Sequence, residues 1–92
     1  MKTYKIALSA GETSEVKPYA VFKVRGRYFG VNRPPYQKGW VVTDILSGYH
    51  TGSRFYRTTA KQALIEGPAF MEDNFDRIGW DAFEIINPEW LP

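Results

Sequence analysis

The chain has 92 residues, of which 43% are hydrophobic and 16% aromatic, and this composition predicts one small folded domain over residues 1–92. It contains no cysteine and a single histidine, which excludes disulfides, thiolate chemistry and multi-histidine metal sites and is typical of a reducing cytoplasm. The longest apolar runs are a few residues, and Ile6-Ala7-Leu8 is too short for a signal peptide. We therefore expect a cytoplasmic protein that does not enter a membrane.

Charge is unevenly distributed along the chain, although the formal net charge is only +2. Residues 1–62 carry 11 of the 12 Lys and Arg but three of the ten Asp and Glu, a net charge of +8, whereas residues 63–92 have a net charge of −6. This asymmetry indicates a molecule with a basic region and an acidic region. Either region is a candidate contact for a partner of opposite charge.

The first part of the chain shows the period-two alternation of half-buried strands. The alternation predicts strands over residues 4–8, 19–25, 27–33, 40–46 and, as a short piece, 54–57. Arg25-Gly26 lies near the tip of a hairpin. The small polar residues 9–15 predict a loop, and the two prolines within residues 33–39 predict a second, exposed loop.

The period changes to that of a helix after residue 58. Thr59 and Gln62 have the spacing of a capping box. A single apolar stripe follows at helical intervals: Ala60, Ala63, Leu64, Gly67, Met71, Phe75 and Ile78. Gly67-Pro68 interrupts this helix and predicts a kink or a break into two short helices, and the continuous stripe favours the kink. Residues 81–87 return to strand-like alternation.

These elements predict an α+β domain. Its antiparallel sheet has about five to six short strands and packs on one kinked helix, which covers one face of the sheet. Leu64, Met71 and Phe75 are expected to be buried against the sheet, because they lie on the apolar stripe of the helix.

Basic and aromatic residues alternate in the first two thirds of the chain and form the candidate site for a partner or nucleic acid. Lys and Arg neutralise phosphates, and aromatic rings stack on unpaired bases. The candidate residues are Lys23, Arg25, Arg27, Tyr28, Arg33, Tyr36, Lys38, Arg54 and Arg57. We expect Arg25 and Arg27 to be exposed and to matter for binding rather than for folding. The alternative is an ordinary hairpin whose rings face the core and whose basic residues face water.

Glu72, Asp73 and Asp76 cluster near the end of the predicted helix. They form either a solvated helix face or an acidic patch that binds a protein, and a Mg²⁺ site is the third alternative. His50 lies in a turn, and the chain lacks the spacing of a nucleophile elbow. We therefore predict no catalytic residues, no metal and no cofactor, and we expect that the protein is not an enzyme.

A single cysteine-free α+β domain, the strand Trp40-Val41-Val42-Thr43 and the capped helix from Thr59 together resemble the small anti-CRISPR proteins that bacteriophages encode. The resemblance covers the overall plan of the chain and transfers no functional residue by position. It implies a monomeric, non-enzymatic inhibitor in the host cytoplasm. Such an inhibitor binds a CRISPR surveillance complex, either through its Cas proteins alone or through its Cas proteins and guide RNA, and blocks recognition of target DNA.

Two other functions stay open alongside the inhibitor. One is an independent module that binds RNA or single-stranded DNA through the basic-aromatic hairpin. The other is a small enzyme, such as a nuclease that uses the acidic cluster.

Overall fold

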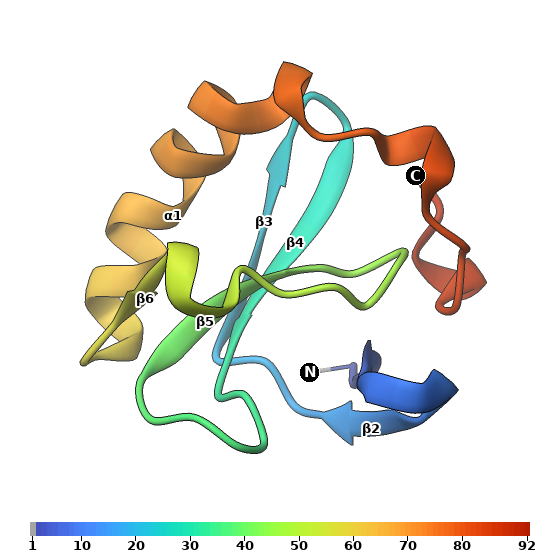
Figure 1. The fold of residues 1–92 in the computed structure, drawn as a ribbon. Coiled ribbons are helices and arrows are strands. Elements are labelled where there is room, and N and C mark those ends of the chain that lie inside the picture. The colour runs from blue at the N-terminus through green and yellow to red at the C-terminus, as the bar shows by residue number, and fades with distance from the viewer. Residues whose placement is uncertain (1) are drawn as a thin grey trace.

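The computed structural model describes residues 2–92, which form six strands in two antiparallel sheets and one α-helix (Figure 1). The first sheet pairs β1 (Tyr4–Ala7) with β2 (Thr13–Val16). The second sheet has the order β3 (Ala20–Val24), β4 (Arg27–Asn32), β5 (Trp40–Asp44) and β6 (Tyr56–Arg57). Helix α1 (Ala60–Asn74) continues into a 3₁₀ turn at Phe75–Arg77. The predicted α+β fold is confirmed, with the strands divided between two sheets.

The predicted hairpin forms from β3 and β4, with Arg25-Gly26 as its two-residue turn. Val24 pairs with Arg27 across the turn. Both turn residues have positive φ, 49° at Arg25 and 84° at Gly26. A two-residue turn between twisted antiparallel strands favours this left-handed backbone at both positions, and glycine adopts it without a steric cost.

Helix α1 begins at the predicted cap and packs on one face of the four-stranded sheet. The Thr59 hydroxyl accepts a hydrogen bond from the Gln62 amide at 3.2 Å, as the capping box predicts. Gly67 is buried, and a Cβ there would lie 3.0 Å from Cγ2 of Val42. Glycine therefore lets the helix approach β5 closely. The helix continues through Pro68, so the alternative of a break into two helices is wrong.

The core between α1 and the sheet contains Phe29 and Val31 of β4, Val42 of β5, and Ala63 and Met71 of the helix, all buried. Met71 therefore lies where the apolar stripe predicts. Leu64 and Phe75 are only half-buried, although both pack against this core. Full burial of those two residues was a wrong prediction.

The opposite face of the sheet is also covered, which the sequence pattern did not predict. Figure 1 shows the β1–β2 hairpin and the C-terminal segment on the side of β3–β5 away from α1. Tyr4, Ile6 and Ile45 are buried in a second core there. The Tyr4 hydroxyl donates to Oδ1 of Asn32 at 2.7 Å, and the Thr43 hydroxyl donates to the same oxygen at 2.6 Å. The central strands are thus buried on both faces.

Three segments differ from the sequence-based expectations. Thr13–Val16 lies in the predicted loop but forms β2, because its backbone pairs with β1 and its side chains alternate between exposed and half-buried. In the predicted strand over 54–57, only Tyr56–Arg57 pairs with β5, and Gly52–Arg54 is a 3₁₀ turn.

Residues 81–87 do not form the expected strand. The buried Asn87 side chain makes the connections that a strand would make: its Nδ2 donates to the carbonyls of Ile45 and Lys5, and its Oδ1 accepts from the Lys5 amide. The Asn87 side chain joins β1 to the segment after β5, together with single backbone hydrogen bonds from Ala7 to Gly48 and from Ile86 and Asn87 to Leu46.

Gly30 lies where β4 passes under the Tyr4 ring, so Gly30→Ala should destabilise the domain. A Cβ at this position would overlap the Tyr4 hydroxyl and lie 2.6 Å from Cζ of the same ring. Overpacking of this kind costs about 1–3 kcal/mol or more. Gly79→Ala is the matched control, because a Cβ at Gly79 meets no atom within 4 Å. Equal unfolding midpoints of the two variants in urea would contradict the close packing described.

Candidate functional site

The predicted basic and aromatic site residues do not form one surface. They fall into a group at one end of the four-stranded sheet, a group at the opposite end, and a group on the face away from α1 (Figure 1). The group at the first end contains Arg33, Tyr36, Lys38, Arg54 and Arg57. The group at the opposite end contains Arg25 and Arg27, and the group on the face away from α1 contains Lys23 and Tyr28. Each group has its own chemistry.

The first group belongs to an exposed surface at the end of the sheet where β4 ends and β5 begins. The register pairs Ala20 with Val31 and Trp40 with Arg57, so β3 also begins and β6 also ends there. We define the sheet-end surface by the aromatic and basic residues that these segments bring together: Tyr19, Arg33, Tyr36, Lys38, Trp40 and Tyr56.

Aromatic rings and guanidinium groups are in contact on the sheet-end surface. The Arg33 guanidinium lies 4.7 Å from the centre of the Trp40 ring, and the Tyr19 ring meets the same ring edge-on at 5.9 Å. Tyr36 is 87% exposed and projects from the loop over residues 33–39. The surface therefore offers one free ring beside a cation that already stacks on a ring.

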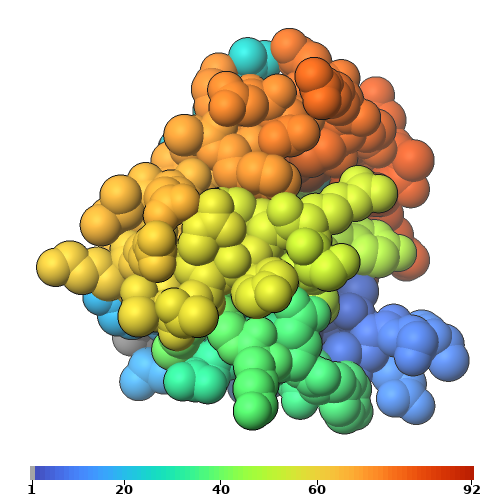
Figure 2. Space-filling model, turned by 60° about the vertical axis from the view of Figure 1, so that its left-hand side comes forward, coloured from blue at the N-terminus to red at the C-terminus, as the bar shows by residue number. Residues whose placement is uncertain are grey.

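The cations of the sheet-end surface have no carboxylate partner. Every ion pair found in residues 2–92 uses Arg25, Arg27 or Arg57, and none uses Arg33, Lys38 or Arg54. Arg54 lies beside the loop, because the Gln37 side chain donates to the Gly52 carbonyl at 3.2 Å. Figure 2 shows the loop and the segment that follows residue 50 side by side on one face of the molecule.

At the opposite end of the sheet, positive and negative residues neutralise each other. Arg25 pairs with Glu72 at 2.9 Å and with Asp76 at 2.8 Å. Its guanidinium also lies 5.1 Å from the centre of the Phe75 ring. The carboxylates raise the pKa of Arg25 through the Glu72 hydrogen bond first and the charge of Asp76 next, so the group stays protonated. Asp73, the third residue of the acidic cluster with Glu72 and Asp76, is exposed and forms neither of these ion pairs.

Arg27 and Asp44 form a bidentate ion pair inside the protein. Nε of Arg27 donates to Oδ1 of Asp44 at 2.7 Å, and Nη2 donates to Oδ2 at 2.9 Å. The two side chains are only 19% and 5% exposed. The Arg27 guanidinium also lies 4.3 Å from the centre of the Trp80 ring. The expectation that Arg27 is an exposed residue of little importance for folding is therefore wrong.

The remaining basic residues of the predicted site are engaged with neighbouring side chains. Lys23 lies 4.7 Å from the centre of the Tyr28 ring, and that ring packs edge-on against Trp90. Arg57 donates to Glu66 at 2.9 Å, and this hydrogen bond lowers the pKa of Glu66. Tyr28 and Arg57 are therefore less available to a partner than the loop residues, whereas Lys23, like Arg33, contacts a ring and has no carboxylate partner within residues 2–92.

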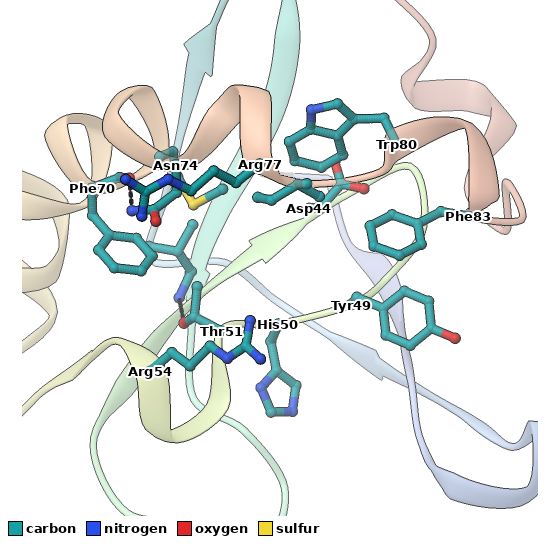
Figure 3. A pocket seen from close by; sticks show the side chains of 13 residues that line it. Asp44, Tyr49, His50, Thr51, Arg54, Phe70, Asn74, Arg77, Trp80 and Phe83 are labelled. Carbon is teal, nitrogen blue, oxygen red and sulfur yellow. Dashed lines mark hydrogen bonds between the residues drawn. The ribbon is translucent and has the colours of Figure 1, made fainter.

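A pocket of about 490 Å³ lies between the end of α1, strand β5 and the segment around residues 49–54. Apolar side chains of β5 and α1 line one side of it, and aromatic rings lie at the other side (Figure 3). The apolar side chains include Val42, Phe70 and Met71, and the aromatic rings belong to Tyr49, Trp80 and Phe83. Of the lining residues, only Arg54 was in the predicted site.

The sequence held a weak signal for this pocket. Arg77 is the only basic residue after position 62, and Trp80 and Phe83 follow it closely. The sequence pattern could not predict that these residues line one pocket with Tyr49 and Arg54, because those two lie more than twenty residues earlier in the chain. Only the turn of the chain after α1 brings the two segments together.

His50 lies at the edge of this pocket and is neutral at pH 7. Its Nδ1 accepts a hydrogen bond from the Gly52 amide at 3.0 Å, so the ring proton is on Nε2. Partial burial lowers the pKa of His50 below its ordinary value of 6.5. Neither Ser47 nor Ser53 is hydrogen-bonded to its ring, since the Ser47 hydroxyl donates to Asp44 at 2.6 Å.

Comparisons of the chain with protein-family models, with curated proteins and with solved structures find no match. Within the described residues there is no group of three or more His, Cys, Asp or Glu side chains that could hold a metal ion. None of the helices in residues 2–92 combines the length and the apolar character needed to cross a bilayer. The surfaces and the pocket described above are therefore the basis for inferring a function.

Removal of Arg27 should destabilise the domain far more than removal of Arg25. Arg27→Ala leaves the buried Asp44 carboxylate without its cation, and breaking a buried pair in this way costs about 3–5 kcal/mol. Arg25→Ala removes ion pairs with exposed carboxylates, which contribute little. Urea denaturation of both variants measures the difference. A loss of stability for Arg25→Ala equal to that for Arg27→Ala would contradict the assignment.

The neutral His50 predicts a loss of stability in acid. Because its pKa is lower in the folded protein than in the unfolded chain, the unfolded chain binds the additional proton as the pH falls below about 6.5. Between about pH 8 and pH 5.5 the wild type should lose more stability than His50→Gln, which keeps a hydrogen-bond acceptor. The comparison requires denaturation curves at both pH values. Identical losses for the two proteins would show that His50 does not titrate as described.

Proposed function

We propose that this chain is a non-enzymatic inhibitor that binds a host RNA-guided surveillance complex, made of Cas proteins and guide RNA, and blocks its recognition of target DNA. The sheet-end surface contacts the complex. The observation that carries the proposal is that Arg33, Tyr36 and Lys38 are all exposed on one loop, without an ion-pair partner for either cation in the described chain. The proposal includes a cytoplasmic location and a monomeric state.

The chemistry of this loop suits the exposed parts of a ribonucleoprotein. Arg33 and Lys38 can each neutralise a phosphate of the RNA backbone, and the free Tyr36 ring can stack on an unpaired base. Tyr and Arg are also residues that carry much of the energy in protein–protein interfaces. Tyr19 and Tyr56, each 49% exposed, widen the surface toward such an interface. The same surface can therefore contact RNA and protein together.

The internal ion pairs favour a ribonucleoprotein over naked nucleic acid as the partner. A protein that binds RNA alone depends on the number of phosphates that it neutralises. Arg25, Arg27 and Arg57 are already paired with carboxylates, which leaves Arg33, Lys38 and Arg54 for phosphates at this end of the sheet. Three contacts support weak binding, so tight binding requires additional contacts with protein.

The alternative is an independent module for RNA or single-stranded DNA. The exposure of Tyr36 favours it, because a ring with one free face binds bases without sequence preference. By contrast, the ion pairs weaken the alternative in which the acidic cluster is a patch that binds a protein. Glu72 and Asp76 are neutralised by Arg25, and Asp73 alone offers little negative charge to such a protein.

Binding assays with purified surveillance complexes, and with the guide RNA free of protein, test the proposal. The double variant Arg33→Ala and Lys38→Ala should bind the complex at least tenfold more weakly, because each lost phosphate contact is charge-assisted. Lys5→Ala with Lys61→Ala is the matched control, since it removes two exposed cations that lie outside the sheet-end surface. The control should bind like the wild type.

Salt dependence separates the inhibitor from the independent module. If Arg33, Lys38 and Arg54 alone contact phosphates, log K for free RNA should fall with log salt with a slope of about −2. If all seven basic residues of the predicted site contacted phosphates, the slope would be about −5. Tight binding to free RNA with the steeper slope, and no binding to any complex, would replace the inhibitor by the module. Equal binding by the double variant and the wild type would overturn both.

A further inference from the structure

The pocket at the end of α1 has the form of a site for a small ligand. Its volume, about 490 Å³, lies within the range of protein sites for small molecules. The pocket contains apolar side chains on one side and a few polar groups at its edge. The rings of Tyr49 and Phe83 also line the pocket.

The aromatic side of the pocket offers a stacking platform, which we define as the exposed Tyr49 ring with the Phe83 ring tilted beside it. The Tyr49 and Phe83 rings lie 5.0 Å apart, and Phe83 meets Trp80 edge-on at 6.0 Å. Tyr49 is exposed, although it is a large apolar residue. Arg27 holds Trp80 in place through its own ring contact at 4.3 Å. Trp80 is perpendicular to Phe83 and supports the platform from the side, so a planar ligand can stack on Tyr49 at little cost in conformational entropy.

Two cations at the edge of the pocket are available to an anion. Arg54 and Arg77 are exposed, and neither takes part in an ion pair within residues 2–92. Arginine binds phosphate in a bidentate way. One carboxylate, that of Asp44, also lines the pocket, but Arg27 donates to both of its oxygens, so its charge is compensated. The two guanidinium groups at the edge are therefore the groups that an anion would contact.

Polar groups on the wall complement the edge of a base. The Asn74 amide donates to the Phe70 carbonyl at 2.8 Å, which leaves its Oδ1 as an acceptor. His50 accepts from Gly52 through Nδ1 and therefore has a donor at Nε2. Figure 3 shows Asn74 beside Arg77 on one side of the pocket and His50 beside Arg54 on the other. A planar ring with donors and acceptors at its edge and an attached phosphate matches this arrangement.

We infer that this pocket binds one nucleotide, with its base on the platform of Tyr49 and Phe83 and its phosphate attracted by the positive charges of Arg54 and Arg77 at the edge. The inference deepens the proposed function and rests on it for the source of the nucleotide, an unpaired unit of the RNA strand. Arg54 connects the two regions, since Gly52 of its turn is hydrogen-bonded to the loop that carries Tyr36. A strand that crosses the loop can therefore place one nucleotide in the pocket. A free mononucleotide has the same chemistry.

Calorimetry with AMP and UMP tests the pocket directly, with adenosine and inorganic phosphate as partial ligands. Both nucleotides should bind more tightly than adenosine or phosphate, because only they contact the platform and the arginines together. Arg54→Ala with Arg77→Ala should weaken nucleotide binding by about tenfold to a hundredfold, since it removes charge-assisted hydrogen bonds. The control Lys61→Ala, an exposed cation away from the pocket, should bind like the wild type.

An eight-nucleotide RNA distinguishes the two sources. Tighter binding of the RNA than of AMP, lost in the Arg54→Ala and Arg77→Ala variant, assigns the pocket to a strand. Binding of AMP without binding of the RNA assigns it to a free nucleotide. Inorganic phosphate binding as tightly as AMP, or no effect of the two substitutions, overturns the inference. In that case Arg33→Ala with Lys38→Ala still tests the proposed function, because those residues lie outside the pocket.

Discussion

The Asp44 carboxylate connects the sheet, the turn that follows it and the segment after α1. It accepts two hydrogen bonds from Arg27 at the start of β4, and it accepts from both the amide and the hydroxyl of Ser47. The first pair fixes the end of the sheet, and the second fixes the turn that leads to Tyr49. Arg27 in turn stacks on Trp80, which follows the helix. One buried ion pair therefore positions both sides of the nucleotide pocket.

The same pair divides the basic residues of the chain by role. At the end of the sheet near Asp44, arginines are used for internal contacts: Arg27 stabilises the fold, and Arg25 joins the hairpin turn to the end of α1. At the other end, Arg33 and Lys38 have no such partner in the part of the chain that the structure describes. The net charge of a region thus says little about its binding capacity, since paired and free cations count equally in the sum.

Local patterns predicted the helix cap at Thr59, the hairpin turn at Arg25 and the α+β class, because each depends on residues close in sequence. The second covered face was not predictable, because it depends on the contact of Tyr4 with Asn32 across 28 positions. The candidate site shows the same limit. Alternation of basic and aromatic residues identified the loop with Tyr36, but it could not show which arginines have acidic partners from distant segments.

We propose that the partner contacts the sheet-end surface and the pocket rather than the hairpin turn. At 10.6 kDa the protein is suited to amide chemical-shift mapping by NMR during titration with a short single-stranded RNA or with a surveillance complex. We expect chemical-shift changes in the amides of residues 36–40 and 49–54, and unchanged amides in residues 24–27. Shifts concentrated at the hairpin turn, with unchanged amides in residues 36–40 and 49–54, would contradict it.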